Sequence, residues 1–294
     1  MTIRFNKNFE FRYATPEPVA PDVVRVVARN PKDYTFKGTN SYLIGDEELA
    51  CIDPGPLLDE HLAALETAIA GRPLKAIFVT HSHLDHSPAA HALAARMGAT
   101  VYAHSAIDPE LAAATDEDVD LEFRPHATLG DGEAVTGKGW RITAVHTPGH
   151  FPNHNCYCLE GSGILFSGDQ VMGWSTTVIS PPLGDLAEYL ASLDRLLLRD
   201  DRRYLPSHGP DIPDPGSWLR ALIAHRAERE RQIVECLSQG FMTPAEIVEC
   251  IYTDLTPRLV LAARQSVRAH LELLRKRGLF AGYFERKRDK AHSA

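Results

Sequence analysis

The stretch Thr80–Ser87, THSHLDHS, holds three histidines and an aspartate at fixed offsets: His81, His83, Asp85 and His86. It directly follows the apolar run LKAIFV at residues 74–79, which has the length and composition of a buried strand. Two interpretations compete. Either the cluster binds metal for chemistry, or a histidine-rich chain has placed a polar loop there by accident. The other residues that could share a metal decide between them.

Three further residues whose side chains can bind metal each come just after a strand-like segment. His150 ends AVHTPGH, Asp169 ends ILFSGD, and His208 ends YLPSH. A metal site needs about four to six donors, which must converge from several loops. Loops at strand ends are where α/β proteins gather functional side chains. We therefore expect these residues to meet the cluster at residues 81–86.

The composition is that of a globular protein with room for one large and one small domain: 294 residues, 44% hydrophobic and 24% charged. The amino terminus lacks the apolar core of a secretory signal, and no uncharged apolar run reaches about 18 residues. We therefore expect a cytoplasmic protein with no membrane partner. The cysteines lack paired spacing, so we interpret them as reduced core residues: Cys51, Cys156, Cys158, Cys236 and Cys250.

Secondary-structure patterns divide the chain in two. Up to about residue 212, β-rich runs alternate with helical patterns at 59–70, 87–97 and 186–198, and Ser87 is expected to cap the second helix. Beyond it, three helical patterns follow at 217–240, 243–252 and 256–278. The middle one opens with a capping box of Thr243 and Glu246, and residues 278–287 read as a hairpin-like wing. We predict domains at 1–212 and 213–294, the second of winged-helix type.

Charge differs between these two parts. Residues from 213 onward carry 14 Lys and Arg against 10 Asp and Glu, whereas the preceding part carries 17 against 29. An acidic large domain is a poor host for a polyanion, because nucleic-acid affinity comes largely from neutralised phosphates. Nucleic acid is therefore a less favoured partner than a small molecule, although the basic tail is a weak indication in the other direction.

The order HSHLDH, TPGH, FSGD and PSHG resembles the metallo-β-lactamase superfamily, and GTNSYLI and CIDPG resemble its early strands. The resemblance covers about residues 22–212. With the helical tail, the chain looks most like the lactamase-beta-2-like branch, whose members carry a C-terminal winged-helix domain. The resemblance implies an α+β fold, a four-layer αββα sandwich followed by a small all-α winged-helix domain. It also implies two zinc ions at the edge of the paired sheets, although iron or manganese occurs with such ligands.

The same resemblance implies a ligand set. One metal would take His81, His83 and His150, the second would take Asp85, His86 and His208, and Asp169 would bridge both. The motif PSHG departs from the commoner PGHG, so Ser207 stands where glycine is usual, which puts the local backbone in doubt.

Two further residues have weaker assignments. Asp53, in the stretch IDPG, is interpreted as the partner of a ligand histidine rather than as an ordinary turn aspartate. His154 is interpreted as a substrate contact, as a support for a ligand, or as an ordinary loop residue.

These residues favour a dinuclear zinc hydrolase using a metal-bridging hydroxide on a thioester, ester or lactam-like carbonyl of a small, anionic substrate. Asp85, both ligand and proton carrier, is the expected catalytic residue. The alternative is a metal-dependent single-strand endoribonuclease of the lactamase-beta-2-like type, and a third is a non-enzymatic regulator that binds nucleic acid through its winged helix. The predicted last helix carries basic residues that are either a solvated face or an anion contact: Arg264, Arg268, Arg275, Lys276 and Arg277.

Overall fold

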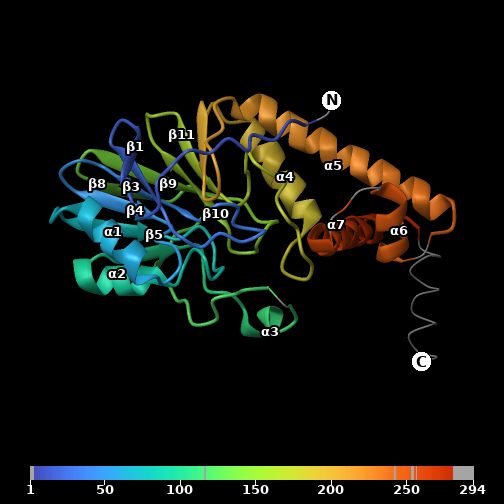
Figure 1. Ribbon diagram of the computed structural model, residues 1–294, viewed down its shortest axis with the longest axis horizontal. Helices are drawn as coiled ribbons and strands as arrows, with labels where there is room; N and C mark the ends of the chain where they lie inside the picture. Colours follow the sequence, from blue (N-terminus) through green and yellow to red (C-terminus); the bar gives the residue numbers. More distant parts are fainter. Residues whose placement is uncertain (1–2, 116, 242, 253–254, 256, 281–294) are drawn as a thin grey trace.

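A computed structural model describes residues 3–280 except 116, 242, 253–254 and 256 (Figure 1). One sheet has seven strands in sequence order: β1 (Glu17–Ala20), β2 (Val23–Val27), β3 (Asn40–Ile44), β4 (Leu49–Ile52), β5 (Leu74–Phe78), β6 (Thr100–Ala103) and β7 (Ala127–Thr128). Neighbours from β1 to β4 are antiparallel, and those from β4 to β7 are parallel. The predicted wing extends beyond residue 280 and so lies largely outside the described residues.

The second sheet has five strands in the order β12 (Arg203–Pro206), β11 (Ile164–Gly168), β10 (Asn155–Leu159), β9 (Trp140–His146) and β8 (Ala134–Gly137). Only β11 and β12 within it are parallel. Sequence patterns did not indicate three short strands, β1, β7 and β8.

Aromatic side chains fill the layer between the two sheets. The ring centroids of Phe78 on β5 and Tyr157 on β10 are 5.1 Å apart, as are those of Tyr42 on β3 and Phe166 on β11. All four side chains are at most 2% exposed, so the inner layer is a continuous apolar core.

Helices cover the outer faces of both sheets (Figure 1). The seven-stranded sheet is covered by α1 (Asp59–Ile69) and α2 (Ala89–Met97), and the other by α4 (Leu186–Leu197) and the first half of α5 (Pro215–Ser238). A single turn, α3 (Pro109–Ala112), lies in the long connection between β6 and β7. The expected αββα sandwich is confirmed. The expected cap at Ser87 is wrong, because α2 begins at Ala89 and the Ser87 hydroxyl instead donates to Asp120 at 2.7 Å.

The C-terminal helices α5, α6 (Pro244–Ile251) and α7 (Pro257–Lys276) share a second apolar core that includes Ile233, Ile247 and Val267. The capping box of α6 is present, with Glu246 N donating to Thr243 Oγ1 at 3.2 Å. Figure 1 shows α5 running from the sheets to α6 and α7. Because Leu273 of α7 joins the core beneath α4, the small domain also packs on the large one. The boundary at residues 212 and 213 stays a prediction.

No helix in the described part of the chain is long and apolar enough to cross a membrane.

Candidate metal centre

The predicted ligands follow strands of both sheets. His81 lies just beyond β5, His150 beyond β9, Asp169 directly after β11, and His208 beyond β12. Backbone hydrogen bonds join these segments: Asn155 N donates to Thr80 O at 2.8 Å, and Asn40 N donates to Ser207 O at 2.8 Å. The strand ends of the two sheets therefore meet at one edge of the sandwich.

The seven predicted ligands come together there. Potential ligand atoms of His81, His83 and His150 lie within 4.8 Å of one another, as do those of Asp85, His86 and His208. His81 Nε2 and His83 Nδ1 are 2.8 Å apart, and Asp85 Oδ2 is 3.1 Å from His208 Nε2. The two groups match the two sets implied by the sequence. That they bind metal stays a prediction.

Asp169 stands between the two groups. Its Oδ2 atom is 3.8 Å from His150 Nε2, and its Oδ1 atom is 3.4 Å from His208 Nε2. A third set of atoms within 4.8 Å joins Asp169 to His81 and His86. The carboxylate therefore lies where one side chain can contact two ions.

Three of the predicted ligand histidines donate from Nδ1 to an oxygen that can only accept. His86 Nδ1 donates to Asp53 Oδ2 at 2.8 Å, His150 Nδ1 donates to Val178 O at 2.8 Å, and His208 Nδ1 donates to Gly38 O at 3.2 Å. Because these acceptors have no hydrogen to offer, each ring carries a proton on Nδ1 and leaves Nε2 as the atom that faces the centre.

Those inward-facing atoms fit a cation. The Nε2 atoms of His86, His150 and His208 and the Oδ1 atom of Asp169 are buried and have no hydrogen-bond partner among the described residues. Buried polar atoms without partners are rare. Histidine nitrogen with carboxylate oxygen is a donor set that suits zinc and related transition metals. The residues present therefore fit the metal ions that the sequence implies.

The electrostatics of the cluster also favour positive charge. Burial alone would lower the pKa of His208, but the carboxylates of Asp169 and Asp85 outweigh it and raise that pKa to about 10. Likewise burial would raise the pKa of Asp85, yet His86 and His208 lower it well below its usual value. By contrast, burial together with the neighbouring His86 lowers the pKa of His81.

Asp53 connects several parts of the centre. Besides His86, its carboxylate accepts hydrogen bonds from Thr80 N and Thr80 Oγ1, both at 2.8 Å, and from Ser207 Oγ at 2.7 Å. Asp53 is fully buried and has a φ of 46°. The structure thus places Asp53 against His86, and its role as the partner of a metal ligand stays a prediction. Ser207 is compatible with this site, because its hydroxyl donates to Asp53.

His154 is fully buried behind Asp169 rather than facing solvent. Its Nδ1 atom is 2.9 Å from Thr147 Oγ1, and its Nε2 atom accepts a hydrogen bond from Asp169 N at 3.2 Å. Among the interpretations considered, this geometry favours support of a ligand over contact with substrate.

Sequence reasoning missed two neighbours of the ligands. His83 Nε2 is 3.5 Å from Glu117 Oε2, and Thr39 Oγ1 is 3.4 Å from Asp85 Oδ2. Burial would raise the pKa of Glu117, but its contact with His83 lowers it. Glu117 has no local signal in sequence, whereas Thr39 lies in the GTNSYLI stretch beside an early strand.

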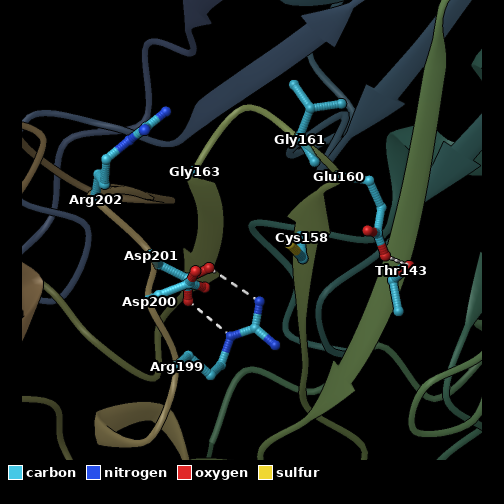
Figure 2. A pocket seen from close by; sticks show the side chains of 10 residues that line it. Thr143, Cys158, Glu160, Gly161, Gly163, Arg199, Asp200, Asp201 and Arg202 are labelled. Atoms are coloured by element: carbon cyan, nitrogen blue, oxygen red, sulfur yellow. Dashed lines mark hydrogen bonds and ion pairs between the residues drawn. The ribbon is translucent and has the colours of Figure 1, made fainter.

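A separate hollow lies at the end of the second sheet that is opposite the candidate metal centre. It is bordered by Cys158 near the end of β10 and Gly163 just before β11 (Figure 2). Its most prominent charges neutralise each other, since Arg199 Nε is 2.7 Å from Asp201 Oδ2. None of the seven predicted metal ligands lines this hollow.

Comparisons with known proteins agree with this geometry. Residues 34–208 match the metallo-beta-lactamase superfamily, and residues 243–281 match the beta-lactamase associated winged helix domain. The chain therefore belongs to the metallo-β-lactamase superfamily. It is a hydrolase of that metal-dependent superfamily, with a His and Asp cluster suited to a metal site and a C-terminal winged-helix domain.

Three similar proteins illustrate the relationship. A beta-lactamase-like protein 2 homolog from Drosophila melanogaster is 30% identical, covering 87% of this chain and 88% of that protein. An atrochrysone carboxyl ACP thioesterase from Cryptosporiopsis sp. (strain 8999) is 28% identical, covering 76% of this chain and 65% of that protein. The crystal structure of a beta-lactamase domain protein from Burkholderia ambifaria has a TM-score of 0.77 at 24% identity, covering 90% and 89% of the two chains.

Proposed function

We propose that this protein is a dinuclear zinc hydrolase that cleaves a thioester, ester or lactam-like carbonyl in a small, anionic substrate. The observation that carries the proposal is the pair of three-residue groups on either side of Asp169. His81, His83 and His150 would hold one ion, and Asp85, His86 and His208 the other, with Asp169 contacting both. When bound, the ions supply a water of lowered pKa and a Lewis acid for the carbonyl oxygen.

The side chains of the centre prepare this chemistry. The Nδ1 hydrogen bonds fix the ring orientations before metal arrives, so the ligand atoms need little rearrangement. Asp85 would act as both ligand and proton carrier. Its Oδ2 atom faces His86 and His208, at 3.3 and 3.1 Å, so the carboxylate can bind through one oxygen and accept a proton on the other.

A thioester substrate is supported by the Cryptosporiopsis relative, whose name is that of an acyl-carrier-protein thioesterase. The similarity in sequence makes the same reaction class a reasonable expectation for this chain. The carrier and acyl group are not implied, because pocket loops decide them.

The alternative of single-strand endoribonuclease activity rests on the basic residues of α7. Arg264 and Arg268 are exposed, and neither forms an ion pair with the described residues. Three bases at or just beyond the C-terminal end of this helix are paired: Arg275 with Glu272, Lys276 with Asp185, and Arg277 with Glu230. The pair of Lys276 and Asp185 joins α7 to the start of α4. The helix therefore also helps to pack the small domain against the large one.

A hydrolysis panel on metal-quantified protein tests the proposal. Protein purified without chelators and with zinc supplied is expected to carry close to two transition-metal ions per chain by elemental analysis. Acyl thioesters, lactams, phosphodiesters and single-stranded RNA are then compared, and carbonyl substrates are expected to react fastest. Absence of bound metal would overturn the proposal. Preferential RNA cleavage that falls steeply with salt would replace it with the nuclease alternative.

A further inference from the structure

The loop after Asp169 orients one metal ligand from behind. Val178 O, in this loop between β11 and α4, accepts the 2.8 Å hydrogen bond from His150 Nδ1. Since a carbonyl can only accept, the position of this one backbone oxygen determines both the tautomer and the ring direction of His150. Whatever holds residue 178 in place therefore also holds a ligand.

Hydrogen bonds involving both its hydroxyl and its carbonyl hold the neighbouring residue, Thr177. Its hydroxyl donates to Asp169 O at 2.8 Å, which ties the loop to the strand end. Its carbonyl accepts a hydrogen bond from Arg226 Nη2 at 2.5 Å, and this second contact comes from α5, far along the chain. The loop is thus fixed between the ligand Asp169 and a helix that continues into the C-terminal core.

Arg226 is a charged side chain in a buried position. It is 3% exposed, and no Asp or Glu in the described part of the chain forms an ion pair with it. Its guanidinium lies 5.3 Å from the ring centroid of Tyr189 on α4, which holds it against the large domain. A buried guanidinium without a carboxylate is costly. The Nη2 atom of Arg226 donates its hydrogen bond to the Thr177 carbonyl.

We propose that Arg226 is a positioning residue for the metal centre: it fixes Thr177 and Val178 so that His150 presents Nε2 toward His81 and His83. The inference rests on the proposed metal-dependent function. It gives α5 a role in the centre, since this helix begins on the large domain and ends in the apolar core shared with α6 and α7.

Substituting Arg226→Met tests the proposal, because methionine keeps much of the packing on Tyr189 and removes the donor to Thr177. The matched control is Arg229→Met. Arg229 lies one turn further along α5, and its guanidinium is 4.2 Å from the ring centroid of Tyr252, directly after α6 and away from the loop. Arg226→Lys, which restores a positive donor, serves as the rescue variant.

Stepwise zinc binding to the metal-free proteins is measured by competition with a chromogenic chelator. We expect Arg226→Met to raise the dissociation constant of one ion by about 10- to 100-fold, the range for loss of a contact that orients a ligand. The second ion should be affected less, Arg229→Met should bind both ions like the wild type, and Arg226→Lys should recover part of the loss. If Arg226→Met does not fold, Arg226→Lys must still bind one ion more weakly than the wild type.

A readout without metal complements the titration. In the wild type the Nδ1 proton of His150 should be slow to exchange in the nuclear magnetic resonance spectrum, and in Arg226→Met it should exchange faster. Wild-type zinc constants in folded Arg226→Met, or in Arg226→Lys where Arg226→Met does not fold, would overturn the positioning role alone, as would equal losses in Arg226→Met and Arg229→Met. A wild-type protein that binds no zinc would instead overturn the proposed function on which it rests.

Discussion

Replacing Asp53 with asparagine is expected to weaken metal binding through His86, although Asp53 itself faces no metal position. In the wild type, Asp53 Oδ1 accepts from Thr80 N, and Oδ2 accepts from Thr80 Oγ1, Ser207 Oγ and His86 Nδ1. Asparagine has one acceptor oxygen. If it remains with Thr80 N, the new amide NH₂ faces His86 Nδ1, which must then accept rather than donate.

That reversal moves the His86 ring proton to Nε2, the atom that points to the metal position. The proton must be displaced before an ion can bind, and the loss of such an orienting carboxylate usually costs about 10- to 100-fold in metal affinity, or about 1.4–2.8 kcal/mol. If the amide turns the other way, its NH₂ faces Thr80 N. A buried donor is then left without an acceptor, at about 1–3 kcal/mol of folding free energy.

The assay combines zinc titration of metal-free protein with urea unfolding of the same sample. Asp201→Asn is the matched control: the Asp201 side chain is 4% exposed, pairs with Arg199, and lies at the far end of the second sheet (Figure 2). We expect both variants to lose stability and only Asp53→Asn to lose zinc affinity. Binding of two ions by folded Asp53→Asn with wild-type constants would refute the reasoning.

Three other changes have expected outcomes. Asp85→Asn should lower turnover at least about 100-fold while the circular dichroism spectrum stays native, and near-normal turnover would show that its role is misassigned. Joint replacement of Arg264 and Arg268 by alanine should change thioester turnover less than about threefold, whereas a reduced salt slope of RNA affinity would favour the nuclease alternative. Because burial and nearby cations lower the pKa of His270 to about 3, its ring is neutral when folded and gains a proton on unfolding below about pH 6.5. Wild-type stability should therefore fall by about 2 kcal/mol between pH 6.5 and 5 from this group, and His270→Leu should lack that part of the fall in urea melts at the two pH values. Besides burial, the groups that lower the pKa of His270 are Arg226, Arg229, His225 and Arg277.

Much of the fold could be predicted because its signals are local. Helical periodicity placed α1, α4 and α7 to within one or two residues at each end, and the capping box at Thr243 is present in the structure. The strands β7 and β8 escaped prediction since one has two residues and the other ends in Gly137, so neither shows an alternating pattern. Ser87 was misread because a nearby carboxylate, Asp120, competes for its hydroxyl.

In the metal centre, too, features with a local sequence signal could be predicted, whereas features that depend on distant contacts could not. Few side-chain types bind metal, so His81, Asp85 and the other predicted ligands could be proposed from type and position, and the structure groups them. Among the groups that contact the Nδ1 atom of a predicted ligand histidine, Asp53 and Thr80 use side chains, whereas Gly38 and Val178 use main-chain carbonyls. Every residue has such a carbonyl, so sequence cannot mark these positions as functional. What determines the carbonyl positions is the path of the surrounding loops, and for Val178 that path depends on a residue of α5. A substitution that leaves every predicted ligand intact can therefore still disturb the centre. We expect this effect from a substitution at Arg226.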